Sequence, residues 1–110
     1  MNELLKLVYE TMDKKQADDI RIIDFRGHSP YVDYFVIASA RNLRLAHAIL
    51  EEVEETVEKN GYEILHRNTS PESRWQLLDL GEIVIHVFCE GEREVYDLEG
   101  LWKDLPLIEL

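Results

Sequence analysis

Cysteine is almost absent from this sequence, which contains one, Cys89, in 110 residues. A single cysteine cannot form a disulfide within the chain, and the N-terminal stretch MNELLKLVYETMDKK lacks the basic-then-apolar order of a signal peptide. No apolar run approaches the roughly 20 residues that a membrane-spanning helix needs. The sequence therefore predicts a soluble, reduced, cytoplasmic protein that makes no use of a membrane.

Basic residues are also scarce. Lys and Arg together number 12 against 23 Asp and Glu, which gives a formal net charge of −11. Tight nucleic-acid binding needs a local basic stripe, but the basic residues are scattered singly, apart from Lys14 with Lys15 and the loose pair Arg41 and Arg44. This pattern argues against direct, sequence-specific nucleic-acid binding. It favours a partner that presents a basic protein surface.

Catalytic and cofactor-binding motifs are missing as well. The sequence has no Walker loop, no Gly-x-Gly-x-x-Gly, no Gly-x-Ser-x-Gly elbow and no cysteine–histidine nucleophile motif. Asp24, Asp33 and Asp79 lie at or near predicted strand ends, but a two-metal nucleotidyl-transfer site needs an Asp-x-Asp pair beside a Gly-Ser turn. We interpret the three carboxylates as caps and turn residues. The sequence predicts no enzyme activity and no cofactor.

A zinc site is the remaining metal hypothesis, because His86 and Cys89 lie close in the sequence. On a strand these two positions differ by an odd number, so their side chains point to opposite faces. Structural zinc sites need four convergent ligands. Cys89 is therefore predicted to be a small buried residue, and no metal is expected.

Helical and strand patterns alternate along the chain. Apolar residues recur every three or four positions at residues 2–16 and from Asn42, the predicted N-cap, to a stop at Gly61. β-branched and aromatic runs predict strands at residues 19–26, 33–39, 62–66, 75–80 and 82–89. A short last helix carries Val95, Leu98, Leu101 and Trp102, and Pro106 closes it, which leaves 107–110 as a tail. This order predicts a single α/β domain over residues 1–110, with helices packed on a mixed sheet of about five strands.

Three features indicate how the strands pair. Segment 33–39 is nearly all apolar, so we expect it at the centre of the sheet, covered on both faces. The order strand, helix, strand from residue 33 to residue 66 predicts parallel pairing through a right-handed crossover. Strands 75–80 and 82–89 are joined at Gly81, which predicts an antiparallel hairpin.

Glutamates line the outer side of the second predicted helix. Glu51, Glu52, Glu55 and Glu58 project away from the apolar positions. A solvated helix surface is the simpler interpretation, and a docking face for a basic partner is the alternative.

The hairpin has two unlike faces. On its first strand Trp75, Leu77 and Asp79 share one side, and His86 and Phe88 lie on the corresponding side of the second strand. The other side is aliphatic and should be core. The side with the tryptophan mixes aromatic, polar and titratable groups, so both a partner surface and a second core remain open there.

Three blocks of this sequence resemble the ribosomal silencing factor family (RsfS, iojap-like): DFRGHSPYVDYFVIAS at 24–39, WQLLDLGEIVIHVF at 75–88 and REVYDLEGLW at 93–102. The resemblance implies a fold related to nucleotidyltransferases without their catalytic residues. It also implies binding to the large ribosomal subunit through ribosomal protein fourteen (uL-fourteen), which sterically blocks association of the subunits and represses translation under nutrient limitation. The family includes dimers, and the sequence leaves both states open.

The family motifs carry over to particular residues. The expected contacts on the tryptophan strands are Trp75, Leu77, Asp79, His86 and Phe88. The third block contributes residues that either contact the partner or pack the last helix, namely Arg93, Tyr96, Glu99 and Trp102. Residues 40–43 and 68–73 depart from the family pattern, so the geometry of the loops beside this surface is expected to differ from that of other members. The alternative function is a nucleotide-binding or nucleotidyl-transfer enzyme on the same scaffold.

Overall fold

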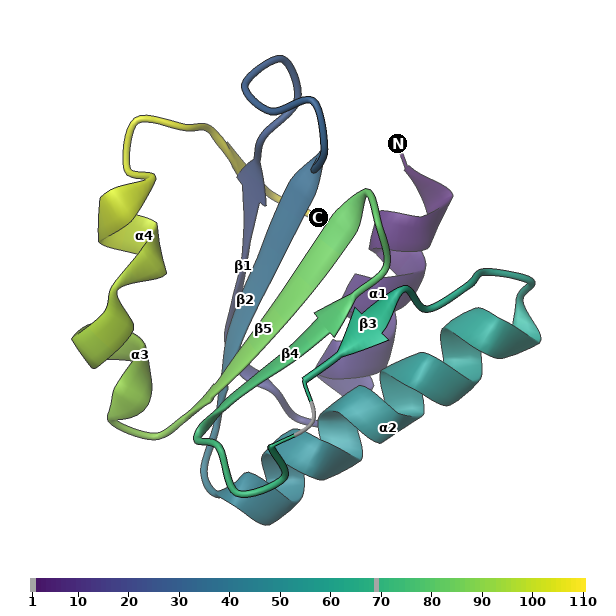
Figure 1. Ribbon diagram of the computed structural model, residues 1–110, viewed down its shortest axis with the longest axis vertical. Helices are drawn as coiled ribbons and strands as arrows, with labels where there is room; N and C mark the ends of the chain where they lie inside the picture. Colours follow the sequence, from purple (N-terminus) through teal and green to yellow (C-terminus); the bar gives the residue numbers. More distant parts are fainter. Residues whose placement is uncertain (1, 69) are drawn as a thin grey trace.

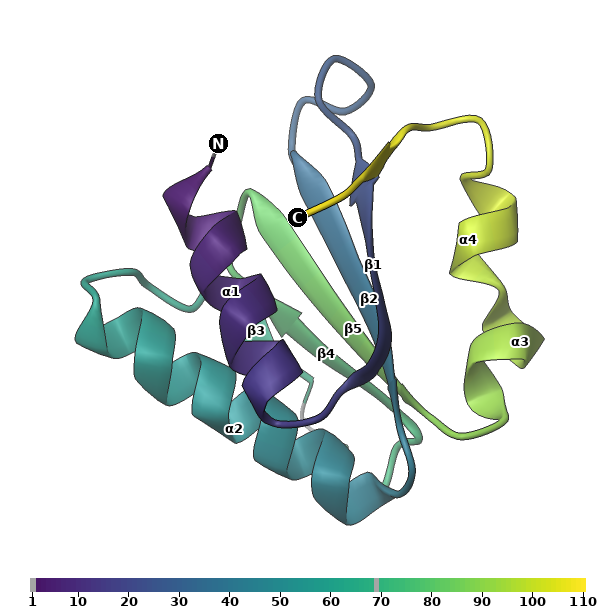
Figure 2. The same ribbon diagram turned by 180° about the vertical axis from the view of Figure 1, so that it is seen from behind.

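The sheet separates two unlike sides of the molecule (Figures 1 and 2). The computed structural model describes residues 2–68 and 70–110. In chain order its elements are α1 (Glu3–Lys14), β1 (Asp18–Asp24), β2 (Tyr34–Ala40), α2 (Leu43–Lys59), β3 (His66–Arg67), β4 (Trp75–Asp79), β5 (Ile83–Cys89), α3 (Glu92–Tyr96), α4 (Leu98–Leu101) and β6 (Leu107–Ile108). The strands form one mixed sheet in the order β3-β4-β5-β2-β1-β6, with α1 and α2 on one face and α3 and α4 over the other. The predicted α/β class is confirmed, with six strands in place of about five.

Asparagine side chains begin both long helices. Asn2 accepts a hydrogen bond from the backbone N–H of Leu5 at 3.1 Å, and Asn42 accepts one from Leu45 at 2.8 Å. Each bond satisfies a backbone donor that the first helical turn leaves free, so the predicted Asn42 cap is confirmed. Just beyond α2, Gly61 has a φ of +88°, a conformation that glycine adopts without strain. None of the helices described in residues 2–68 and 70–110 combines the length and the apolar character that crossing a bilayer would require.

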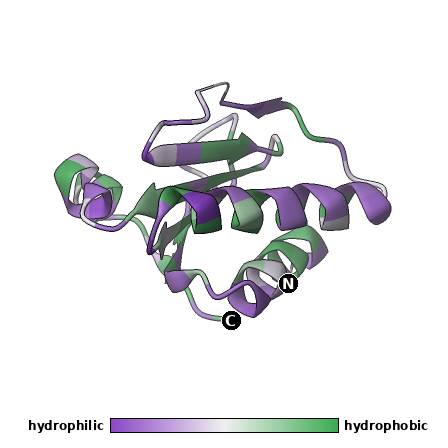
Figure 3. Cartoon of the chain, turned by 90° about the horizontal axis from the view of Figure 1, so that it is seen from below, coloured by the Kyte–Doolittle hydropathy of each residue, from purple (hydrophilic) through white to green (hydrophobic). Residues whose placement is uncertain are grey.

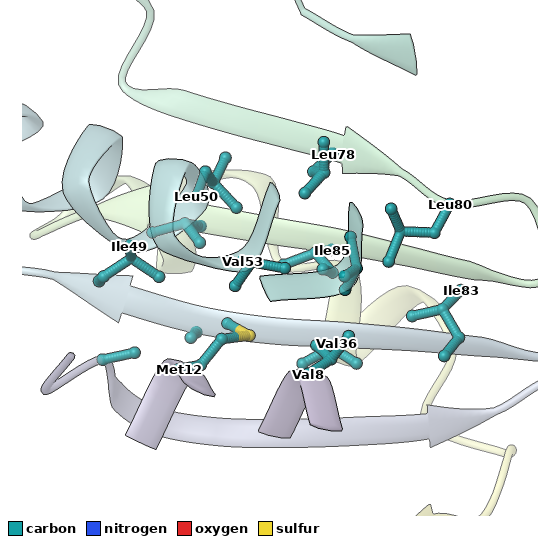
Figure 4. Packing of buried hydrophobic residues seen from close by; sticks show 14 of the residues in the cluster. Val8, Met12, Val36, Ile49, Leu50, Val53, Leu78, Leu80, Ile83 and Ile85 are labelled. Atoms are coloured by element: carbon teal, nitrogen blue, oxygen red, sulfur yellow. The ribbon is translucent and has the colours of Figure 1, made fainter. Parts of the chain in front are cut away.

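The main core lies between the sheet and helices α1 and α2. All seven residues of β5 are buried, and the alternate residues Ile83, Ile85 and Val87 point into this core. Side chains that pack on them from the two helices are shown in Figure 4 and include Val8, Met12, Ile49, Leu50 and Val53. Hydrophobic and hydrophilic stretches alternate along both helices, as expected of amphipathic helices (Figure 3). The prediction that the aliphatic side of the hairpin is core is confirmed.

The predicted parallel pairing of segment 62–66 is wrong. The parallel partner of β2 is β5, with Tyr34 opposite Ile83 and Ala40 opposite Cys89. The chain after α2 forms only the two-residue strand β3, which lies at the sheet edge and pairs antiparallel with β4. β5 is apolar on both faces and takes the central position, where both faces are covered, so the more polar stretch is left at the edge. The predicted β4–β5 hairpin is confirmed.

The C-terminal residues do not form the predicted tail. β6 (Leu107–Ile108) pairs antiparallel with β1, and the carbonyl oxygen of Pro106 accepts a hydrogen bond from the backbone N–H of Asp24 at 2.9 Å. Proline lacks a backbone donor but keeps its acceptor, so it does not prevent the chain from joining the sheet. The expectation that the chain is unpaired beyond Pro106 was therefore wrong.

The short last helix is divided in two. Asp97, between α3 and α4, has a left-handed φ of +46°. Its carboxylate accepts a hydrogen bond from the backbone N–H of Gly100 at 3.0 Å, which caps α4. A Cβ at position 100 would meet that carboxylate, so any other residue there would displace the Asp97 side chain from its capping position. We call residues 92–101 the α3–α4 segment. It runs from the end of β5 towards the end of β1 and stands over one face of the sheet (Figure 1).

Candidate partner-binding surface

A row of rings crosses the sheet on the face that carries the α3–α4 segment. It runs from Trp75 on β4 through His86 on β5, Phe35 on β2 and Phe25 after β1 to Trp102 after α4. Successive ring centroids lie 5.8, 4.6, 4.4 and 5.1 Å apart, within the range of favourable aromatic contacts. We call these five residues the aromatic row. It joins the two tryptophans of the sequence into one surface feature.

Trp75 is held on three sides. Its ring stacks on Phe88 with a centroid distance of 5.1 Å, and Tyr96 from α3 contacts it at 4.6 Å. The indole Nε1–H donates a hydrogen bond to Nδ1 of His86 at 3.0 Å. The side chain stays partly exposed, although Tyr96 of the α3–α4 segment covers part of the ring. The Trp75 ring is therefore held in one conformation while part of it stays exposed. Anchor residues at protein interfaces have this arrangement, because a side chain that is already ordered loses little entropy on binding.

His86 is neutral and beneath the surface. Only 3% of the residue is exposed, and burial lowers its pKa from 6.5 to about 4. Because Nδ1 accepts the Trp75 hydrogen bond, the ring proton resides on Nε2, for which the described residues provide no partner. Cys89 on the same strand faces the aliphatic core, so the predicted separation of these two side chains is confirmed.

Arg93 fastens the α3–α4 segment to the sheet. The side chain is 7% exposed, donates to Oε1 of Glu99 at 2.7 Å, and reaches Oγ of Ser39 on β2 at 3.0 Å. Glu99 also lies 3.7 Å from Arg21 on β1. A buried guanidinium needs such partners, so Arg93 and Glu99 act mainly in packing the segment. Packing of the last helix is one of the two roles that the sequence left open for them, and a partner contact stays a prediction.

The site residues expected from the sequence fall into two groups. Trp75, Leu77, Asp79 and Glu99 are partly exposed, while Tyr96 and Trp102 are 49% and 38% exposed. The residues beneath them are buried, with exposed fractions of 3% for His86, 0% for Phe88 and 7% for Arg93. The tryptophan side of the hairpin is thus both a small second core and a surface resting on it.

Acidic side chains near the row are engaged in local bonds. Asp79 accepts a hydrogen bond from the backbone N–H of Gly81 at 2.8 Å, and Asp24 pairs with Arg26 at 2.9 Å. The hydrogen bond from Arg26 holds the pKa of Asp24 below its usual range. These are turn bonds of the kind predicted for both carboxylates. Within residues 2–68 and 70–110, no three His, Cys, Asp or Glu side chains are placed to hold a metal ion.

Two members of the row, Phe25 and Phe35, were not singled out from the sequence. Segment 33–39 was interpreted as a strand covered on both faces. Its successive side chains point to opposite faces of the sheet, and this alternation separates Phe35 from its two neighbours. Tyr34 and Val36 point into the aliphatic core, whereas Phe35 belongs to the smaller cluster on the other face. A period-2 reading of that strand would have placed Phe35 beside the tryptophan surface.

Comparison with known proteins identifies the family of the chain. The whole chain, residues 1–110, matches the family described as "Ribosomal silencing factor during starvation". It is 38% identical over 107 residues to the ribosomal silencing factor RsfS of Bacillus subtilis, a match that covers 97% of this chain and 91% of the relative. It is 32% identical over 95 residues to the chloroplastic protein Iojap of Zea mays, covering 86% of this chain and 41% of that protein.

Solved structures are similar as well. A crystal structure of a protein from Bacillus halodurans superposes with a TM-score of 0.86 at 35% identity and covers 98% of both chains. A protein from Chromobacterium violaceum gives a TM-score of 0.86 at 27% identity, with 94% of this chain and 88% of that one covered. The sequence blocks, the sheet order and the full-length matches agree, and the chain belongs to the ribosomal silencing factor family, RsfS.

Proposed function

We propose that this protein binds the large ribosomal subunit through ribosomal protein uL-fourteen and sterically blocks association of the subunits. The effect is to repress translation when nutrients are limiting. The observation that supports this most is the aromatic row, with Trp75 partly exposed at one end and Trp102 38% exposed at the other. Rigid tryptophans at the surface are the residues most enriched where protein partners bind tightly.

The charge of the molecule suits such a partner. A net charge of −11 attracts a basic ribosomal protein and repels the phosphates of RNA, so it speeds encounter with the protein component of the ribosome. Asp79 lies on the Trp75 strand and makes no ion pair with another described residue. It is therefore free to pair with a basic side chain of the partner at the edge of the aromatic contact.

The predicted contacts divide by accessibility. Trp75, Leu77, Asp79, Tyr96 and Trp102 touch the partner in this proposal, because each has exposed surface. His86, Phe88, Arg93 and Glu99 act from beneath or beside them by fixing the rings and the α3–α4 segment. The protein works in the cytoplasm by occupancy alone, with no cofactor and no chemical step.

Co-sedimentation tests the proposal directly. The full chain should pellet with isolated large subunits and not with assembled ribosomes, in which the joining surface is already covered. Adding the protein to separated subunits should lower the fraction that joins on raising magnesium. Equal binding to free and assembled subunits would contradict a joining block, and failure to bind free large subunits would remove the proposed function altogether.

A further inference from the structure

An apolar hollow of about 490 Å³ opens at the Trp102 end of the aromatic row. Its apolar lining includes Phe25, Val32, Phe35, Trp102 and Leu105. Loop 27–32 and the chain after α4, which contribute several of these residues, lie at the same end of the molecule in both views (Figures 1 and 2). We call this the Phe35 hollow.

The hollow is linked to Trp75 through the aromatic row. Phe35 lines the hollow and contacts His86 at a ring-centroid distance of 4.6 Å, and His86 accepts the hydrogen bond of the Trp75 indole. A partner seated on Trp75 and extending along the row would therefore arrive over the hollow. Interface anchors typically fill such desolvated pockets, and a hollow left empty beneath a partner would forfeit dispersion contacts.

The charge of the chain limits what occupies the hollow. The net charge of −11 repels the phosphates of RNA and attracts a basic protein, which favours a basic protein as the occupant. The polar side chains at the rim are few: His28 and Ser29 line it, and the hydroxyl of Ser29 is already engaged with the backbone N–H groups of Tyr31 and Val32. The lining thus suits an apolar side chain, with little provision for a polar ligand.

We infer that the Phe35 hollow is a second anchor site on the partner surface and receives a bulky apolar side chain from the same basic protein that contacts Trp75. This inference rests on the proposed function and extends it to residues outside the expected contacts, chiefly Phe25, Val32, Phe35 and Leu105. Two anchors at opposite ends of the row fix the orientation of the partner, which a single tryptophan does not. Steric exclusion of a ribosomal subunit depends on such a fixed orientation.

Filling the hollow tests the inference. Val32→Trp places a large ring in the space, and Tyr31→Ala is its matched control, because Tyr31 is the adjacent residue, is 84% exposed and does not line the hollow. We expect Val32→Trp to weaken co-sedimentation with isolated large subunits at least tenfold and Tyr31→Ala to change it less than twofold. His28→Trp, at the exposed mouth, serves as a second blocking variant if Val32→Trp has a lowered thermal midpoint.

The outcomes separate the two proposals. If the wild-type chain binds and a folded blocking variant binds equally well, the hollow is not an anchor site and the proposed function stands. If the wild-type chain does not bind, the proposed function falls and the hollow falls with it. A photo-crosslinking phenylalanine in place of His28 identifies the occupant: a basic large-subunit protein supports the inference. Ribosomal RNA, a second copy of this chain, or no crosslinked ribosomal protein overturns it.

Discussion

The two faces of the sheet bury their side chains by different means. Towards α1 and α2 the strands present aliphatic residues, most of which are fully buried beneath these two long helices. On the other face the strands present rings, and the short α3–α4 segment covers only part of them. The first face is closed and the second is half open, although both belong to the same strands.

Under the proposed function, one face of the sheet serves stability and the other serves partner binding. Aliphatic side chains interdigitate with helices and contribute through the volume they fill. Aromatic rings that contact one another stay ordered even where no helix packs over them. They present a large apolar area, and they lose little side-chain entropy when a partner binds. Changes on the closed face should therefore alter unfolding, and changes on the open face should alter binding. The following predictions test this division in order of decreasing effect.

The neighbouring residues Leu78 and Leu77 provide the sharpest test, since they point to opposite faces of β4. Leu78 is fully buried in the aliphatic core, so Leu78→Ala should lower the free energy of unfolding by about 4 kcal/mol. Leu77 is partly exposed, so Leu77→Ala should cost about 1 kcal/mol or less. Urea unfolding of the two variants measures both values. Equal losses would show that the two faces do not differ in their contribution to stability.

Acid should act on the open face through His86. Its pKa is about 4 in the folded protein against 6.5 for an ordinary histidine, so between these values the unfolded chain binds a proton that the folded chain does not. Stability should therefore fall as pH falls from about 6.5 to 4, by up to about 3 kcal/mol. The matched variant His86→Phe should lose this part of the pH dependence, as measured by urea unfolding across that range. Parallel pH profiles for the two proteins would contradict the assignment.

Trp75 should affect binding more than folding. Trp75→Ala removes the ring that would reach the partner, and we expect binding to isolated large subunits to weaken by about 2 kcal/mol, or roughly 30-fold. Trp75→Phe is the control, because it keeps a ring over Phe88 and removes only the indole N–H that bonds to His86. Co-sedimentation gives the affinities, and circular dichroism shows whether each variant is folded. An unfolded Trp75→Ala protein would place Trp75 in the core and move the site elsewhere.

The smallest predicted effect concerns the cover of the open face. Asp97→Ala removes the α4 cap and puts alanine into a left-handed conformation that aspartate and asparagine tolerate better, at a cost of about 1 kcal/mol. Asp97→Asn keeps both features and should be nearly neutral. Amide hydrogen exchange should rise in residues 92–101 for the alanine variant alone. Faster exchange throughout the sheet would mean that the segment supports the whole fold and is more than a cover.

Much of the fold follows from local pattern. Asn42 predicted the start of α2 because a cap acts on the next three residues, and the apolar alternation of Ile83, Ile85 and Val87 predicted the core side of β5. The partner of β2 did not follow, because a strand–helix–strand order does not specify which later strand takes the neighbouring position. The strand that takes this position is the one whose two faces are best buried there, and this depends on all the strands of the sheet together.

The candidate site was predictable in part for the same reason. Trp75 and Asp79 share a face by simple alternation, and this needs no tertiary information. The burial of Phe88 and Arg93 does not follow from alternation, since it depends on where the α3–α4 segment returns across the sheet. Phe25 and Trp102 meet across 77 positions of sequence only because that segment ends near the end of β1.

The two short outer strands have a consequence for how this molecule is recognised. β6 pairs with β1 at Ile22 and Ile23, and Asn68 bonds to both Leu77 and the carbonyl of Trp75 beside β3. The outer strands β3 and β6 are each only two residues long, so each presents few backbone groups that could pair with an added strand. Such short outer strands disfavour β-augmentation and edge-to-edge aggregation, so in the proposed function discrimination between partners depends on side chains on the face of the sheet.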